Sequence, residues 1–359
     1  MPPAPGTARA ILIDRLGPPE VLVERDVPLH EPGSGEVLLR VEAAGVNFAD
    51  LIMRQGLYQT VPPRPFSPGF EVAGRVAAVG AGVEGWAPGE RALALIRFGG
   101  YASHVIVRAD QLFRYPDTLT PAQAAAIPVV FLTAWVCLFE SARVREGETV
   151  LVLGAAGGVG TAAVQLARAK GLRVVGTAGG PAKCAFVTKE LGAHACVDSR
   201  ADWEAEVRAI VGPRGVDAAL DPVGGPATAA CRRLLAPLGR IVFYGMSAAI
   251  GGTRRNYLRA WWALRRTPRF HPYGFVAPNI GVLGVHLLHL QAKEALLRPA
   301  MEEILRGVAA GEWRPVLDRT FPLTREGAVA AHRHLHERRA MGKIVLVSSD
   351  AAAPPAPNR

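Results

Sequence analysis

Continuous apolar runs in the middle of the chain are each followed by glycines or by a helical pattern. Residues 149–153 form one such run, which passes into the glycine-rich segment 154–160 and then into the alanine-rich segment 161–167. A short continuous apolar run is typical of a strand buried on both faces, and the alanine-rich segment favours a helix. The pattern predicts a buried strand, a tight turn and a helix.

The alternation of strands and helices continues beyond this unit. Further apolar segments predict strands at 172–177, 216–221, 240–245 and 280–285, and helices at 122–141, 181–191 and 227–235. Alternation of this kind indicates an α/β fold with a doubly wound parallel sheet, the Rossmann arrangement. The segment 280–285 would lie at a sheet edge, where antiparallel pairing with its twin would give a two-fold homodimer.

The N-terminal part shows short strands separated by glycine and other turn residues. They are predicted at 8–13, 21–23, 36–46, 69–80, 89–95 and 102–107. Close spacing of this kind favours a small antiparallel, barrel-like domain. The C-terminal tail is expected to complete it with helices at 292–308 and 325–338 and strands at 315–323 and 343–347. The predicted domains are therefore 1–124 with 286–359, and 125–285.

An insertion at about 247–279 interrupts this regularity. Six arginines surround Tyr257, Leu258, Trp261 and Trp262, which have helical spacing. A basic helix with a tryptophan pair suits a membrane interface, a lid over the active site or a dimer contact. The segment joins two strands near the ligand cleft that is expected outside the carboxyl ends of a parallel sheet. A lid or a dimer contact is therefore favoured over a membrane contact.

Charge and cysteine content limit the class of protein. The formal net charge is +10, half of the residues are hydrophobic and a fifth are charged. Such a balance suits a globular enzyme with a multiply charged ligand, and the scattered arginines indicate no dedicated nucleic-acid surface. The four cysteines form no metal-binding spacing, and the N-terminus lacks the apolar core of a signal peptide. We therefore expect a cytoplasmic protein.

The glycine-rich turn has the features of a dinucleotide site. Ala155 replaces the usual first glycine, whereas Gly157 lets the backbone approach a pyrophosphate and Gly160 lets the helix pack on the strand. Free N–H groups at the helix start then face the phosphates. The position between a strand and a helix supports this interpretation.

The residues after the second strand indicate which dinucleotide binds. An NAD site usually carries an acid about 20 residues after the turn, but residues 176–178 are Gly, Thr and Ala. Two glycines and Lys183 follow, a polar turn with one cation that suits a 2′-phosphate. The sequence therefore predicts NADPH over NADH.

Three histidines alternate in the last predicted helix, at His332, His334 and His336. Alternate residues of a helix do not converge on one face, so these side chains are not expected to bind zinc together. We expect solvated histidines.

Together, several motifs carry a family resemblance over residues 9–347: the segments 45–50, 54–58, 68–74, 132–135, 155–160 and 342–346. The chain resembles the zinc-independent quinone oxidoreductases of the medium-chain dehydrogenase/reductase superfamily. The insertion, with the segments 278–279 and 284–287, looks most like the vesicle amine transport protein branch. The resemblance implies a GroES-like, partly open β-barrel catalytic domain beside the Rossmann domain.

The resemblance also implies that no metal site is present. Zinc-dependent relatives place a cysteine where Asn47 stands and a histidine where Phe70 stands, and neither replacement supplies a zinc ligand. The cysteine-rich lobe that holds their structural zinc is missing, since Leu95 runs almost directly into Tyr101. What remains is hydride transfer from NADPH to a quinone or an α,β-unsaturated carbonyl.

Specific residues acquire roles through the same resemblance. Asn47 would lie beside the nicotinamide ribose, and Thr133 would hydrogen-bond the carboxamide. Tyr58 would donate to the substrate carbonyl or line the cleft wall, and Asp50 would orient Asn47 or serve as a helix N-terminal charge. The implied cofactor contacts are Asn47, Thr133, Ala156, Gly157, Gly158, Val159, Gly160, Thr177, Lys183, Tyr244, Asn279 and Lys343.

One departure and two alternatives accompany this assignment. Ser199 follows Val197-Asp198 where many relatives carry a tyrosine near the adenine, which puts adenine stacking there in doubt. An enoyl-thioester reductase is the enzymatic alternative. A non-catalytic, membrane-associated adaptor that binds NADPH is the other.

Overall fold

The chain divides into two units in the computed structural model, which describes residues 6–290 and 293–349. Unit 1 comprises Met1–Val129, Gly252–Arg255 and Leu317–Arg359, and unit 2 comprises Val130–Gly251 and Asn256–Val316.

These boundaries differ from the predicted ones at three places, the first being the boundary predicted at 124/125, which lies at 129/130. Helix α10 (Glu294–Ala309), expected in the first domain, belongs to unit 2, where Glu303 on α10 lies 3.6 Å from the Lys170 ammonium. The short segment Gly252–Arg255 of the predicted insertion belongs to unit 1, because the Gln55 amide donates to the Gly252 carbonyl at 3.1 Å.

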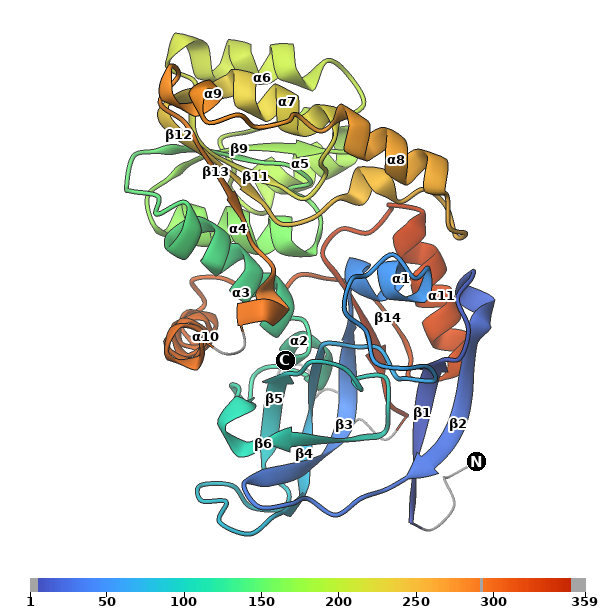
Figure 1. The fold of residues 1–359 in the computed structure, drawn as a ribbon. Coiled ribbons are helices and arrows are strands. Elements are labelled where there is room, and N and C mark those ends of the chain that lie inside the picture. The colour runs from blue at the N-terminus through green and yellow to red at the C-terminus, as the bar shows by residue number, and fades with distance from the viewer. Residues whose placement is uncertain (1–5, 291–292, 350–359) are drawn as a thin grey trace. The chain divides into compact units, whose positions relative to one another are not determined.

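Unit 2 contains the expected doubly wound sheet. Its six parallel strands lie in the order β10-β9-β8-β11-β12-β13, so chain order along the sheet reads 3-2-1-4-5-6, and helices cover both faces (Figure 1). The strands are β8 (Thr149–Val152), β9 (Arg173–Ala178), β10 (Ala195–Asp198), β11 (Val216–Asp221), β12 (Leu235–Phe243) and β13 (Gly281–Gly284). The strand order reverses between β8 and β11, and a dinucleotide binds outside the carboxyl ends at such a point.

The helices of this unit explain why the strands are apolar throughout. They are α3 (Pro128–Trp135), which starts in unit 1, α4 (Gly158–Ala169), α5 (Pro181–Lys189), α6 (Trp203–Val211), α7 (Pro226–Leu234), α8 (Tyr257–Arg266), α9 (Tyr273–Val276) and α10. On one face of the sheet Leu151, Val175 and Ile241 pack in one cluster with Val207 of α6 and Leu234 of α7. Because helices cover both faces, no strand needs an alternating polar face.

Unit 1 is built around a seven-stranded sheet. The strands follow the path β14-β15-β3-β4-β5-β7, and β6 pairs with β3. They are β3 (Glu36–Val46), β4 (Glu71–Val79), β5 (Arg91–Leu95), β6 (His104–Arg108), β7 (Leu112–Phe113), β14 (Leu317–Pro322) and β15 (Lys343–Val347). A separate ribbon, β1 (Thr7–Ile13) with β2 (Leu22–Pro28), and the helices α1 (Phe48–Arg54), α2 (Pro121–Ala124) and α11 (Arg325–His336) complete it. The C-terminal tail therefore returns to this unit, except for α10.

Among the described residues, one helical run, Pro121–Ser141, is long and apolar enough to span a membrane. Of its most apolar window, 78% is buried inside the protein, as expected for a core helix.

We expect Gly160→Ala to destabilise the protein. A Cβ at Gly160 would lie 2.7 Å from the Ala155 Cα, and the obstructing atoms are backbone. Overpacking of this kind costs about 1–3 kcal/mol, or a drop in Tm of roughly 2–4 °C per kcal/mol. Thermal unfolding measures it, with Gly179→Ala as the control because open space surrounds that position. Equal Tm values for the two variants would contradict the prediction.

Candidate functional site

The predicted site residues fall into one group in each unit. Unit 1 holds Asn47, Asp50, Tyr58 and Lys343, and unit 2 holds the others. Each group is built from its own unit.

Asn47 lies between the end of β3 and the start of α1. Its backbone N–H donates to the Asp50 carboxylate at 2.7 Å, and the Gly69 N–H donates to the other Asp50 oxygen at 3.2 Å. Asp50 is fully buried. The carboxylate therefore fixes the backbone of Asn47 and also caps the start of α1, so both interpretations of Asp50 stay predictions.

Lys343, at the start of β15, is buried against Asn47. Its ammonium lies 2.6 Å from Glu71 Oε1, and it donates to the Val46 carbonyl at 2.8 Å and to Asn47 Oδ1 at 2.5 Å. An ammonium has three N–H donors, and these three acceptors take all of them. In this structure the Lys343 side chain orients Asn47, and its predicted contact with the cofactor stays a prediction.

Glu71 completes the cluster, and sequence reasoning missed it. Glu71 Oε1 also accepts from Asn47 Nδ2 at 2.9 Å, while Oε2 accepts from the Val129 N–H at 2.7 Å. The Asn47 carboxamide is thus held with its oxygen toward Lys343 and its nitrogen toward Glu71. The available signal was a carboxylate among apolar neighbours, in the run Phe-Glu-Val-Ala at 70–73.

The residues of this cluster do not fit a catalytic zinc. Phe70 is buried, with its ring centroid 6.1 Å from that of Tyr58 and 5.9 Å from that of Phe98. Neither its ring nor the Asn47 amide is the thiolate or imidazole that zinc binds. Within 6–290 and 293–349 there is no group of three or more His, Cys, Asp or Glu side chains arranged to hold a metal ion.

Tyr58 follows α1 and is partly buried. Burial raises the pKa of its phenol to about 12, and the nearby Asp50 charge acts in the same direction. The hydroxyl therefore stays protonated and able to donate a hydrogen bond at physiological pH.

A second buried chain of hydrogen bonds ends on Asp50. Arg54 Nε lies 3.2 Å from His332 Nδ1, His332 Nε2 lies 3.3 Å from the Tyr101 hydroxyl, and that hydroxyl donates to Asp50 Oδ2 at 3.1 Å. Because Arg54 only donates, His332 Nδ1 must accept and Nε2 carries the hydrogen. In all three hydrogen bonds the donor is therefore the group nearer to the Arg54 guanidinium, and the acceptor is the group nearer to the Asp50 carboxylate.

This chain corrects the expectation of solvated histidines. His332 is fully buried, and burial followed by the Arg54 charge lowers its pKa well below the ordinary value. His334 also has a partner, with Nε2 2.7 Å from Asp318. The alternation argument excluded shared zinc binding but did not show that one face of α11 is buried.

In unit 2 the glycine turn lies at the carboxyl end of β8, beside the reversal of strand order. The Ala155 N–H donates to the Thr177 carbonyl at 2.8 Å, and Gly157 is the residue immediately before α4. A Cβ at Gly157 would lie 3.3 Å from the Gly154 carbonyl. The first N–H groups of α4, from Gly158 onward, have no intrahelical acceptor and suit an anion such as a pyrophosphate.

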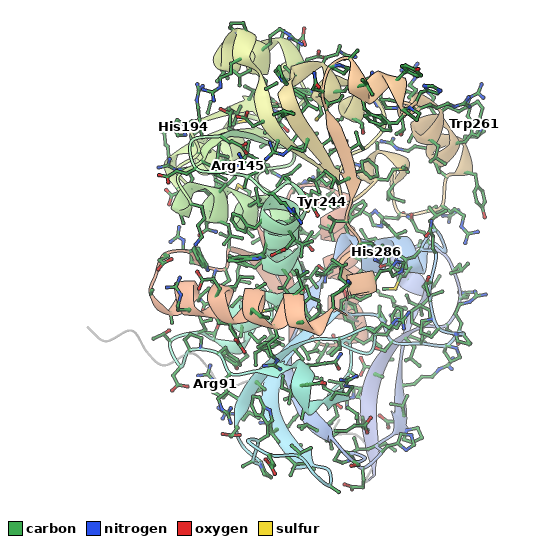
Figure 2. The ribbon with its side chains drawn as sticks, turned by 60° about the vertical axis from the view of Figure 1, so that its left-hand side comes forward. Arg91, Arg145, His194, Tyr244, Trp261 and His286 are labelled. Carbon is green, nitrogen blue, oxygen red and sulfur yellow. The ribbon has the colours of Figure 1, made fainter. Side chains whose placement is uncertain are left out.

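Two other predicted cofactor residues of this unit, Thr177 and Tyr244, lie at the same ends of the strands. Thr177 is buried near the end of β9, where its Oγ1 lies 3.4 Å from the Gly154 N–H. Tyr244 (Figure 2) directly follows β12, and its N–H donates to the Asp221 carbonyl at 3.1 Å. Burial, together with Cys137 and Asp221, raises the pKa of its phenol well above the ordinary value. Thr133 is buried on α3, four residues before Cys137.

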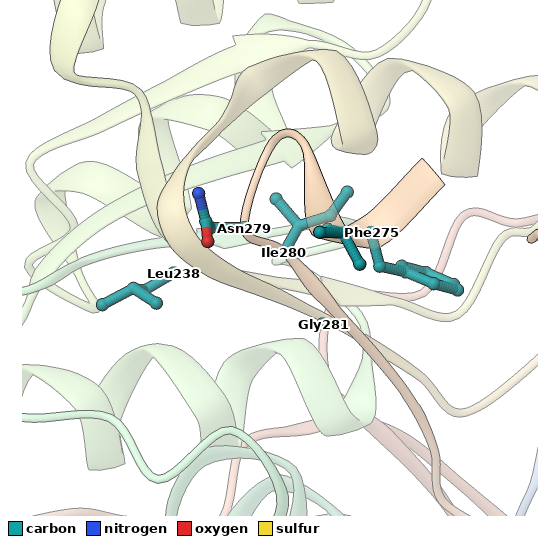
Figure 3. A pocket seen from close by; sticks show the side chains of 6 residues that line it. Leu238, Phe275, Asn279, Ile280 and Gly281 are labelled. Carbon is teal, nitrogen blue, oxygen red and sulfur yellow. The ribbon is translucent and has the colours of Figure 1, made fainter. Parts of the chain in front are cut away.

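Asn279 is the exception. It precedes β13, and its carbonyl accepts from the Leu238 N–H at 2.6 Å. Together with Phe275 and Ile280 these residues line a shallow pocket of about 280 Å³ (Figure 3). This is the amino end of β13, opposite the carboxyl ends where a dinucleotide binds. The structure therefore corrects the predicted cofactor contact of Asn279.

Helix α8 of the insertion presents its large side chains outward. Trp261 (Figure 2) is 57% exposed and Leu258 80% exposed, while Ala263 is buried. The Arg265 guanidinium lies 5.1 Å from the Trp261 ring centroid, a cation–π contact. The predicted helix is confirmed, and the role of its exposed face stays a prediction.

Two protein-family models match the chain. One, described as an alcohol dehydrogenase GroES-like domain, matches residues 33–117, and the other, described as a zinc-binding dehydrogenase, matches residues 191–346.

Individual proteins are similar over most of the chain. The synaptic vesicle membrane protein VAT-1 homolog of Rattus norvegicus is 39% identical over 88% of this chain and 78% of its own. The quinone oxidoreductase of Rattus norvegicus is 33% identical over 94% of this chain and 97% of its own.

Solved structures agree in fold. Mycobacterial Rv1454c complexed with NADPH has a TM-score of 0.82 and 30% identity over 95% of this chain and 99% of that one. The CurK enoyl reductase has a TM-score of 0.81 and 26% identity, with the same shares covered.

We expect Asp50 to make stability depend on pH. Burial raises the pKa of its carboxyl from 3.8 to about 6, against opposing hydrogen bonds from Asn47 and the charge of Lys343. Since the pKa is higher in the folded state, the stabilisation is complete below 3.8 and is lost as pH rises through 6. Two pKa values this far apart correspond to about 3 kcal/mol.

Asp50→Asn removes this titration. The free energy of unfolding of the wild type minus that of Asp50→Asn should therefore fall by about 3 kcal/mol between pH 3.5 and pH 7. Denaturant unfolding at several pH values measures this difference. A difference that stays constant over the range would show that Asp50 does not titrate there.

Proposed function

Because this chain belongs to the medium-chain dehydrogenase/reductase superfamily of oxidoreductases, we propose that it transfers a hydride from NADPH to a quinone or an α,β-unsaturated carbonyl without a metal. The observation that carries the proposal is the Asn47–Glu71–Lys343 cluster. In it an ammonium supplies the buried positive charge, and no thiolate or imidazole is available to bind zinc.

This chemistry limits the acceptor. A metal acts as a Lewis acid when it polarises an unreactive alcohol or carbonyl. Without that help, the acceptor must already be electrophilic, as quinones and α,β-unsaturated carbonyls are. The quinone oxidoreductase among the relatives supports the quinone class.

The residues of unit 2 fit a dinucleotide. The turn at Gly157 and the start of α4 suit a pyrophosphate. The end of β9 carries no acid that could accept a hydrogen bond from the ribose hydroxyls of NADH. When bound, NADPH supplies the hydride from its reduced nicotinamide ring. The NADPH complex of the mycobacterial relative supports this choice of cofactor.

The residues of unit 1 would serve the acceptor. Tyr58 keeps its proton and would donate to the acceptor oxygen, on which negative charge develops as the hydride arrives. Asn47, held by Lys343 and Glu71, would present a fixed amide to the reactants. Preorganised donors of this kind stabilise charge without reorganising during the reaction.

Two other functions stay in view. The CurK neighbour is named an enoyl reductase, which favours an enoyl-thioester reductase as the runner-up, and turnover of a short enoyl-CoA would support it. A non-catalytic adaptor would bind NADPH tightly yet oxidise none with any quinone, enone or enoyl thioester. The name of the VAT-1 homolog is the reason to retain this possibility.

We expect Tyr58→Phe to lower kcat for NADPH oxidation by tenfold or more in a panel of quinones, enones and enoyl thioesters. The loss of one such donor commonly costs two to three powers of ten, and partial solvent access reduces that cost here. Tyr273→Phe is the control, since it removes a hydroxyl from a residue that is 81% exposed. An unchanged kcat would assign Tyr58 to the pocket wall.

We also expect a homodimer through β13. This strand lies at the edge of its sheet, where unpaired backbone groups are open to a second chain. Light scattering should give twice the chain mass, and Leu283→Lys, on the edge strand, should give the mass of one chain. A monomeric wild type would contradict the proposed interface.

A further inference from the structure

The turn after β9 has a neighbour that sequence reasoning missed. Strand β10 pairs in parallel with β9, and Asp198 at its end lies opposite Ala178. Residues that follow β10 therefore lie beside Gly179 and Gly180, the turn predicted to take a 2′-phosphate. Arg200 is one of them.

Asp198 holds this turn and Arg200 together. Its Oδ1 accepts from the Gly180 N–H at 2.9 Å and from Arg200 Nε at 3.0 Å, and its Oδ2 accepts from Arg200 Nη2 at 2.8 Å. The Arg200 guanidinium lowers the pKa of Asp198 to about 2. The carboxylate is therefore ionised and engaged through both oxygens.

The Arg200 guanidinium lies directly over Gly180. A Cβ at Gly180 would lie 2.9 Å from the Arg200 Cζ, and the φ of +102° at Gly180 also favours glycine. The Arg200 side chain is 64% exposed, so a ligand can reach it. Asp198 takes two of the five guanidinium N–H groups, and the other three have no partner in the described part of the chain.

We propose that Arg200 is the residue that selects NADPH, by binding the 2′-phosphate with its remaining N–H groups. This inference rests on the proposed function. A planar guanidinium with an exposed edge suits a phosphate, and a charge-assisted pair of hydrogen bonds is stronger than a neutral one. Lys183, in the first turn of α5, would add a second positive charge.

The same arrangement disfavours NADH. An acid near this turn would normally accept hydrogen bonds from the ribose hydroxyls of NADH. Residues 176–178, where that acid normally stands, are Gly, Thr and Ala, and Asp198 lies instead at the end of the neighbouring strand β10, where both of its oxygens accept from Arg200. Removal of the guanidinium thus has two effects: the phosphate loses its donor, and the carboxylate becomes available to a ribose.

Arg200→Gln tests the proposal in the full-length protein. Fluorescence titration gives the Kd of NADPH and of NADH, and 2′,5′-ADP serves as a competing probe of the phosphate site. We expect the Kd of NADPH and of 2′,5′-ADP to rise tenfold or more, while that of NADH stays the same or falls. Arg208→Gln, which alters an arginine bonded to Glu204 on α6, should leave all three unchanged.

Different failures have different meanings. A wild type that binds NADPH and NADH equally would overturn the choice of NADPH and the role of Arg200 with it. A wild type that prefers NADPH, with Arg200→Gln changing its Kd less than twofold, would overturn only the role of Arg200. If Arg200→Gln raises the Kd of NADPH and of NADH by the same factor, Arg200 maintains the conformation of the turn and does not bind the 2′-phosphate.

Discussion

The ion pair between Lys343 and Glu71 is the constraint on which the rest of unit 1 depends. Both side chains are buried, and a buried charge is tolerated only when its partner and its hydrogen bonds are in place. Loss of one partner of such a pair typically costs about 3–5 kcal/mol. The pair also joins β15 to β4, strands far apart in sequence, and fixes the Asn47 amide between them.

A second buried network of hydrogen bonds fixes the backbone of Asn47. The hydrogen bonds that run from Arg54 through His332 and Tyr101 to Asp50 all share one direction. Because Arg54 keeps its protons, this series of hydrogen bonds cannot release a proton at its Arg54 end. Its effect is to position Asp50 and the Asn47 backbone. Asn47 is thus held at its side chain by one network and at its backbone by the other.

The sequence predicted the architecture well where apolar patterns were continuous, and less well where a single buried polar side chain decided the outcome. The strand at 216–221 and the helix within 325–338 follow from periodicity and appear in the structure. Asn279 was assigned from motif position, but only the strand register shows that it lies at the amino end of β13. The burial of His332 depends on its contact with Tyr101, about 230 residues away in the sequence. The position of Arg200 beside Gly180 depends on the pairing of β10 with β9. No local sequence pattern contains either contact.

The metal content of the active protein tests the central claim most directly. Zinc is measured in the purified protein, and NADPH oxidation with a quinone is followed before and after dialysis against a strong chelator. We predict far less than one zinc per chain and an unchanged rate. One zinc per chain, with a rate that disappears on its removal and returns when zinc is restored, would contradict the account.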